Sequence, residues 1–325
     1  MHPAFSVIFL TTLIGVGQGM FLALVTGQTY AAIDILPHHD EHIFYGLGSL
    51  ISLVLLGLGL LASFFHLGHP ERAWRAAAMW RTSWLSREVI VLPAFMFFVF
   101  LFGVLHYFNW DPNLLGEGAP PESQLTYIVG IVGTVVCFML FLCTGMIYAC
   151  LKFLQEWHTP LTPINYTLLG MASGFTLATV FSSYAAPEWV DFYGNWTVIL
   201  TLLAFVFRIA SLVRNNRIKH KSNLQTAIGV RHTKIQQKAQ GSMGGSFNTR
   251  EFFHGAKPAF FKSIKWIFLV LVFPIPIILV LIGLSSSAAQ LLLAAFVMQY
   301  IGLLAERWFF FAQAKHPQNL YYQTI

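Results

Sequence analysis

The sequence has very little charge. Only 10% of its 325 residues are charged, whereas a typical soluble domain carries about 25%. The chain is 56% hydrophobic and 16% aromatic, and its mean hydropathy is +0.65. Such a small number of polar side chains does not cover the water-facing surface of a soluble fold. The composition excludes a disordered protein, a fibrous protein and most soluble enzymes, and it indicates an integral membrane protein.

Cysteine is also scarce. The three cysteines, Cys137, Cys143 and Cys150, all lie in one apolar segment. Their spacing fits neither a C-x-x-C metal pattern nor a disulfide framework, so we expect buried, small hydrophobic side chains. We therefore expect no metal site and no iron–sulfur cluster on this chain. No polar stretch is long enough for a separate domain, so we expect residues 1–325 to form one membrane domain.

Long apolar runs dominate what remains. A membrane span needs about 20 mostly apolar residues, and its backbone polar groups must be satisfied within the segment, so the runs are expected to be helices. We predict an all-α bundle of eight transmembrane helices. Their expected ranges are 6–30, 43–66, 87–108, 125–151, 163–185, 195–213, 264–283 and 287–311. Pro274 and Pro276 predict a kink in the seventh, and glycine pairs such as Gly15 and Gly19 predict close helix packing.

Basic residues are absent from one face of this predicted bundle. All 19 lysines and arginines fall on the side that holds the N-terminus, the C-terminus and the loops after the second, fourth and sixth helices. The other side carries only acidic charges. The positive-inside rule therefore places both termini in the cytoplasm. No predicted helix centre carries a charge, which argues against a transporter or a channel.

The sixth loop, about 214–263, is the only long polar stretch. Its basic first half is typical of an anchor on anionic membrane lipid. We do not expect nucleic-acid binding, because aromatic residues are not interleaved with these basic residues. The second half reads GSMGGSFNTREFFHG and predicts a docking surface for a partner protein. The expected contacts there are Arg250, Glu251, Phe252 and Phe253.

The second loop brings a histidine and a carboxylate to the same predicted depth. His66 ends one helix and Glu88 begins the next, just inside the cytoplasmic interface. An imidazole can bind a quinone oxygen and exchange a proton near neutral pH, and a nearby carboxylate can relay that proton. Arg72 or Arg87 is expected to keep Glu88 ionised. The plainer alternative is that His66 caps a helix end and Glu88 pairs locally at a helix start.

Three tryptophans and two further arginines complete this loop. Trp74, Trp80 and Trp84 suit the membrane interface, and we expect Trp84 to border a bound quinone. Arg75 and Arg81 are expected to face solvent or a partner protein.

A membrane haem b needs two histidines from different helices at matching depth. His66 and His106 lie at opposite ends of the predicted bundle, so they cannot share a haem. His42 and His106 both lie near the acidic side and could meet there. We nevertheless expect no haem.

Two segments resemble a known family. The run HLGHPERAWRA followed by WRTSWLSREV, together with GGSFNTREFFHG, is similar to the membrane anchor subunits of dimethyl sulfoxide reductase type (DmsC). The opening MHPAFSVIFLTT extends the resemblance over most of the chain. Within the family the sequence is most similar to the SoeC branch, the membrane subunit of cytoplasmic, quinone-linked sulfite dehydrogenase.

The resemblance implies a multi-pass subunit of the bacterial inner membrane. Such anchors have no haem, and they bind an iron–sulfur subunit and, through it, a molybdopterin catalytic subunit, here on the cytoplasmic face. The family's quinone-site histidine corresponds to His66 and its following carboxylate to Glu88. The quinone would be ubiquinone or menaquinone. Alternatives are an anchor that oxidises quinol for a dimethyl sulfoxide, polysulfide or thiosulfate reductase, and a purely structural anchor.

Overall fold

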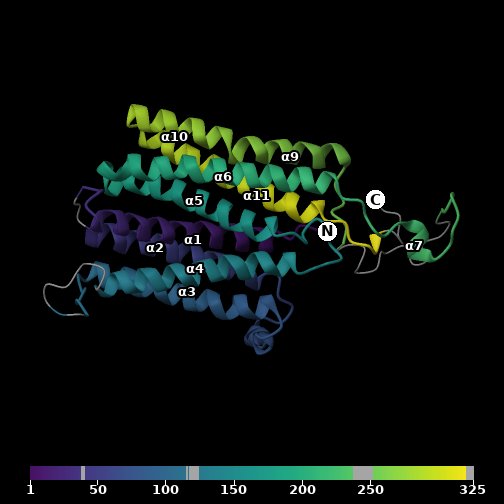
Figure 1. Cartoon of the computed structure of the whole chain (residues 1–325), viewed down its shortest axis with the longest axis horizontal. Helices are drawn as coiled ribbons and strands as arrows, with labels where there is room; N and C mark the ends of the chain where they lie inside the picture. Colours follow the sequence, from purple (N-terminus) through teal and green to yellow (C-terminus); the bar gives the residue numbers. More distant parts are fainter. Residues whose placement is uncertain (38–40, 115, 117–123, 237–251, 320–325) are drawn as a thin grey trace.

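The computed structural model describes residues 1–37, 41–114, 116, 124–236 and 252–319. Within these ranges the chain is helical, and eight helical segments are long and apolar enough to cross a membrane. The segments pack side by side as one elongated bundle (Figure 1). The prediction of an all-α bundle with eight spans is confirmed.

The spans follow the predicted order with small shifts at their ends. The first six are α1 (Phe5–Ala32), α2 (Glu41–Phe64), α3 (Trp84–Tyr107), α4 (Leu125–Ala149), α5 (Leu161–Ala185) and α6 (Val190–Asn216). The seventh consists of α9 (Pro258–Val272) and α10 (Pro274–Ser286), and the eighth is α11 (Ala289–Gln313). Shorter elements lie between them: η1 (Pro70–Met79), η3 (Pro187–Trp189) and α7 (Leu224–Ile228).

The predicted kink in the seventh span is a full break. Phe273, with φ −114° and ψ −76°, separates α9 from α10. Pro274 has no backbone N–H and its ring disfavours helical geometry in the residue before it, so the helix restarts at the proline. Pro93, by contrast, lies within a continuous α3.

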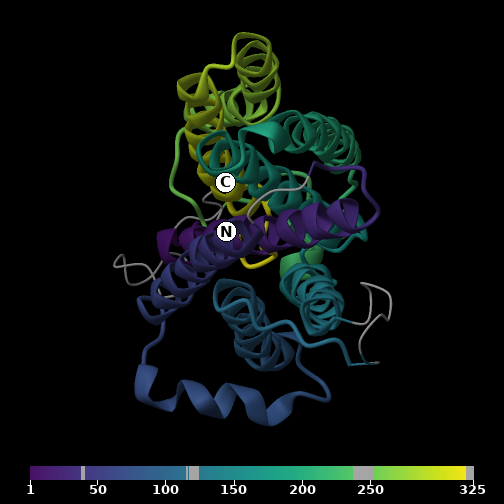
Figure 2. The ribbon, with the colours of Figure 1, turned by 90° about the vertical axis from the view of Figure 1, so that its left-hand side faces the viewer.

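Helix α1 occupies the middle of the bundle, where it packs against α2, α4, α5 and α11 (Figure 2). Its contact with α5 depends on glycine. A Cβ atom on Gly19 would lie 2.9 Å from Cα of Gly174 and would overlap the carbonyl group of Gly170, and one on Gly174 would overlap the backbone of Gly19. The close packing predicted for these small residues is therefore present, and no larger side chain fits at this crossing.

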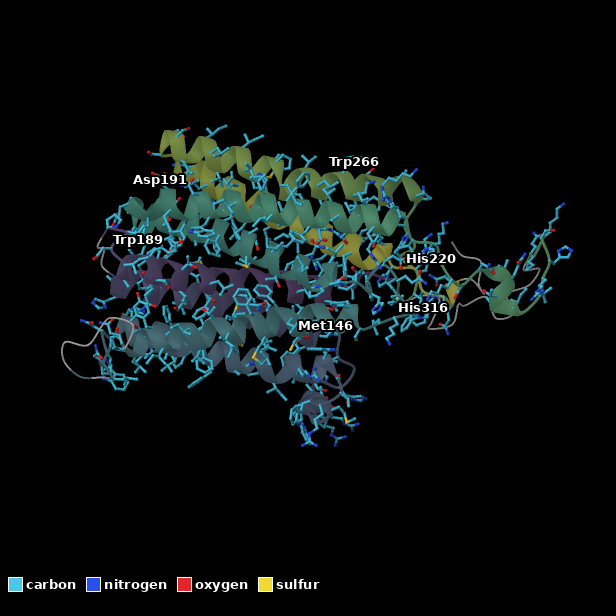
Figure 3. The ribbon with its side chains drawn as sticks, viewed as in Figure 1. Met146, Trp189, Asp191, His220, Trp266 and His316 are labelled. Atoms are coloured by element: carbon cyan, nitrogen blue, oxygen red, sulfur yellow. The ribbon has the colours of Figure 1, made fainter. Side chains whose placement is uncertain are left out.

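The two ends of the bundle differ in charge. Met1, η1 and α7 lie at one end, which we call the basic end (Figure 1). There the N-terminal amine donates a hydrogen bond of 2.7 Å to the carbonyl of Ala314. His220 and His316 lie beyond the helices at this end, and Trp189 and Asp191 lie at the other, the acidic end (Figure 3). The helix order thus reproduces the predicted charge separation.

One expectation about a side chain is wrong, and two arginines lie in an unexpected place. Cys137 and Cys143 are buried, but Cys150 is exposed just after α4. Arg208 and Arg307 were counted among the basic residues of the cytoplasmic side, yet they are 2% and 4% exposed and lie inside α6 and α11. Glu306, fully buried beside them, supplies the carboxylate that makes this burial possible.

The α1–α5 crossing gives the first testable prediction. Gly174→Ala places a methyl group against the α1 backbone, so it should lower the free energy of unfolding by about 1–3 kcal/mol despite the better helix propensity of alanine. The matched control is Gly57→Ala, because a Cβ atom there meets no atom within 4 Å. Thermal unfolding in detergent measures both. Equal stability of the two variants would contradict the packing argument.

Candidate functional site

The second loop crosses the basic end between α2 and α3. Helix α2 ends at Phe64, a short turn follows, and Pro70 starts η1, where its missing N–H costs nothing. Helix α3 then begins after Ser83, whose hydroxyl accepts a hydrogen bond of 3.4 Å from the backbone N–H of Ser86. Residues of η1 are not buried, and η1 lies across the outside of the bundle (Figure 2). The loop therefore presents an open surface at the helix ends.

His66 was predicted to be the last residue of the second helix, but it lies in the turn directly after α2. Its side chain is exposed. Partial desolvation by the surrounding protein nevertheless lowers the pKa of its imidazole below the ordinary value. The neutral ring therefore predominates at pH 7, with one nitrogen that accepts and one that donates a hydrogen bond.

Glu88 is one turn into α3 and points into the bundle. Its carboxylate accepts a hydrogen bond from the Thr144 hydroxyl of α4. A cavity of about 10 Å³, the size of one water molecule, lies beside it. The cavity walls include Thr11 and Gly15 of α1 and Tyr166 of α5. The carboxylate is thus the inner group of the predicted pair, and His66 is the outer one.

The arginines expected to keep Glu88 ionised bind elsewhere. Arg87 donates to the carbonyl oxygens of Trp80 and Arg81 at 2.9 and 2.8 Å. Its guanidinium also lies 4.2 Å from the ring centre of Trp84. Arg72 lies 3.7 Å from Glu71. The structure does not support the expected pairing with Glu88, because at Arg87 the nearer backbone carbonyls satisfy the guanidinium.

The predicted docking residues divide into three groups. Arg75 and Arg81 lie over their neighbours Trp74 and Trp80, which are 71% and 52% exposed, and they are available to a partner. Phe252 instead stacks on His316 of the chain's own C-terminal segment, with ring centres 3.8 Å apart. Phe253 is half-buried beside His254. Arg250 and Glu251 lie outside the described residues.

The acidic end holds a second polar feature. His42 and His106 line one cavity of about 490 Å³, as their predicted depth allowed. A hydrogen-bond series leads into it: Thr126 donates to Asp111 at 2.8 Å, and Gln28 donates to Thr126 at 3.0 Å. The same amide nitrogen lies 3.3 Å from Nε2 of His106. Across the described residues, no three His, Cys, Asp or Glu side chains gather as a metal site would require.

Similarity to known proteins over the whole chain decides the family. The family model described as the DMSO reductase anchor subunit, DmsC, matches residues 1–322. The chain belongs to the DmsC family. It is also 58% identical to the C subunit of sulfite dehydrogenase from Allochromatium vinosum, over the full length of both chains.

Membership of the DmsC family identifies the general role of this chain. The chain is the membrane anchor subunit of an oxidoreductase complex and is associated with catalytic and electron-transfer subunits. This role agrees with a chain that has eight helical segments long and apolar enough to cross a membrane.

The structure also contains polar residues that the sequence reasoning did not single out. Thr144 holds Glu88, and Tyr166 separates Glu88 from the buried Arg307. A threonine or tyrosine in an apolar run gives little signal, because each is compatible with a helix packed in a bundle. The pair Glu306–Arg307 inside the last apolar run was the one available signal, since membrane helices rarely carry adjacent charges.

The hydrogen bond between Thr144 and Glu88 gives the second prediction. Thr144→Val keeps the side-chain shape but removes the donor, so it should lower the free energy of unfolding by about 1–3 kcal/mol. In the Glu88→Gln background the same change should cost less, because a neutral amide depends less on the donor. A double-mutant cycle of thermal unfolding measures the coupling, with Thr144→Ser as the control that keeps the hydroxyl. Additive effects would show that the two side chains do not interact.

Proposed function

We propose that this anchor is the quinone-reactive subunit of a molybdopterin and iron–sulfur oxidoreductase, and that the catalytic partner oxidises sulfite to sulfate. The observation that carries the proposal is the arrangement at the basic end: an exposed, neutral His66 near the membrane surface and an inward Glu88 behind it. Full-length similarity to a sulfite dehydrogenase component supports sulfite as the electron donor.

The reaction sets clear demands on this chain. Oxidation of sulfite with water gives sulfate, two protons and two electrons. Reduction of a quinone, either ubiquinone or menaquinone, consumes two electrons and two protons to give the quinol. The protein near the quinone must therefore bind its oxygen and deliver protons, while the electrons arrive from the partner's iron–sulfur clusters.

The residues of the basic end fit these demands. The neutral imidazole of His66 donates a hydrogen bond to a quinone oxygen, and Glu88 supplies a carboxylate that exchanges protons. The ring of Trp84, at the start of α3, provides an apolar wall at the membrane interface. Arg87, held by backbone carbonyls, fixes the start of α3 and does not bind the quinone in this arrangement.

The charge distribution supports a cytoplasmic basic end in a bacterial inner membrane. The partner subunits would then dock in the cytoplasm, over the surface formed by η1 with Arg75 and Arg81. Electrons and protons would enter the quinone from the same side, so quinone reduction need not build a membrane potential.

The third prediction tests the quinone site. His66→Ala in the whole complex should leave sulfite oxidation with a soluble dye unchanged and should reduce sulfite-dependent quinone reduction by about 10²-fold or more, the usual cost of removing a proton-exchanging group. The matched control is His69→Ala, in the same loop, whose ring is 3.1 Å from Glu71 and exposed. Equal quinone turnover in the His66 variant would refute the assignment.

The fourth prediction tests the dock. Arg75→Glu with Arg81→Glu should weaken retention of the catalytic and electron-transfer subunits on the purified anchor, and the difference from the parent should be largest at low salt, because salt screens these charges. The control is the same charge change at Lys219 and Lys221, two exposed residues after α6. Co-purification measures both. Equal retention in the two variants would place the dock elsewhere.

The alternative functions would give different results in these experiments. If the anchor is purely structural, quinone will not bind to the isolated subunit, and His66→Ala will not affect turnover of the complex. If the complex oxidises quinol for a reductase, it will lack sulfite-dependent quinone reduction but will oxidise quinol with an added acceptor. Sulfite-dependent quinone reduction by the purified complex therefore decides between these branches.

A further inference from the structure

A positively charged cluster is buried between α6 and α11. The Glu306 carboxylate forms an ion pair with each arginine: Nε of Arg208 lies 2.7 Å from one oxygen, and Nε of Arg307 donates a hydrogen bond of 2.6 Å to the other. All three residues are at most 4% exposed. They lie about two helical turns from the basic ends of their helices. One carboxylate between two guanidinium groups leaves a net charge of +1 inside the bundle.

The surroundings of the cluster do not neutralise this charge. The Arg307 guanidinium lies 4.0 Å from the ring centre of Tyr166, and that of Arg208 lies 5.3 Å from the ring of Phe268. Nη1 of Arg307 and Nη2 of Arg208 have no hydrogen-bond partner among the described residues. A buried charge in a membrane bundle is costly and commonly marks a functional element.

Small separate cavities with wall residues in common lie between this cluster and Glu88. The cavity beside Glu88 reaches Thr11, Gly15 and Tyr166. A second cavity, of about 20 Å³, shares those three residues and extends to Arg307. A third, of about 10 Å³, lies among Tyr166, Arg307, Glu306 and Arg208. Each is the size of one or two water molecules and has a few polar groups in a mostly apolar wall. Tyr166 borders all three.

Glu88 has no basic partner of its own among the described residues. The titratable groups of the helices packed around it are Cys143 and Tyr148 of α4 and Tyr166 of α5. Helix α1 contributes only neutral groups to its cavity. Arg87, on the same helix, is half-buried and donates its hydrogen bonds to the loop carbonyls, not to Glu88.

We propose that Arg208, Glu306 and Arg307 form a positioning site that acts on Glu88 through Tyr166 and the intervening cavities. The net positive charge of the cluster favours the ionised carboxylate, because charges interact strongly in the poorly solvated bundle interior. Glu306 holds the two guanidinium groups in place and limits the charge to +1. This inference rests on the proposed function. The cluster explains how a carboxylate within the bundle stays able to exchange a proton with the quinone site.

The test follows the protonation of Glu88 directly, in the whole complex and without turnover. Infrared titration records the protonated carboxyl band that Glu88→Gln removes. Arg307→Met makes the cluster neutral, so the midpoint of that band should move to higher pH by about one unit. Arg307→Met with Glu306→Gln leaves Arg208 alone and restores the net charge of +1. The midpoint should then return toward the parent value.

The single and double variants separate the effect of the cluster's charge on Glu88 from the effect of altered packing. The same shift in the single and double variants, or no shift in either, would overturn the proposal. If Arg307→Met fails to assemble, Arg208→Met and its double variant with Glu306→Gln make the same comparison from the other side of the cluster. The infrared result does not depend on quinone chemistry. If Glu88→Gln retains full quinone turnover, the proposed function of Glu88 fails while the shift still tests the cluster.

Discussion

Where α1 crosses α5, Gly19 and Gly174 bring two backbones so close that a Cβ atom on Gly19 would lie 2.9 Å from Cα of Gly174. Lipid supplies no hydrophobic force between helices, so close packing of this kind holds such bundles together. The same crossing determines the polar interior. Thr11 and Gly15 of α1 and Tyr166 of α5 meet toward the basic end of this contact, and together they form the walls between Glu88 and the buried arginines.

The sequence predicted the helices well because the membrane imposes a strong rule. A backbone in lipid must satisfy its own hydrogen bonds, so each apolar run became a helix, and the ends shifted by only a few residues. The rule does not determine which side of a helix faces the bundle. Cys150 therefore turned out exposed and Phe252 stacked on the chain's own tail, because helix rotation and tail docking depend on contacts far apart in sequence.

The same limit explains how much of the site could be predicted. The helix pattern placed His66 and Glu88 at one depth near the same end of the bundle, but it could not assign them different surroundings. Glu88 is held inside by Thr144, which lies 56 residues further along the chain, and His66 stays outside in the turn after α2. Arg87 is next to Glu88 in sequence, yet backbone carbonyls of the preceding loop bind it. Neighbours in sequence are poor predictors of ion pairs where a helix begins.

Arg208 and Arg307 show how a correct topology can conceal a site. Counting them as cytoplasmic-side charges led to the right helix order, although both side chains are buried. Replacing a buried ion pair with well-packed apolar residues is often neutral or stabilising in proteins. Stability alone is therefore a weak reason for two arginines and one glutamate inside a membrane bundle. The adjoining cavities of Glu88 and Arg307, which share Thr11, Gly15 and Tyr166 as wall residues, supply a stronger one, because a fixed positive charge at that position acts on a carboxylate that has no basic partner among the described residues.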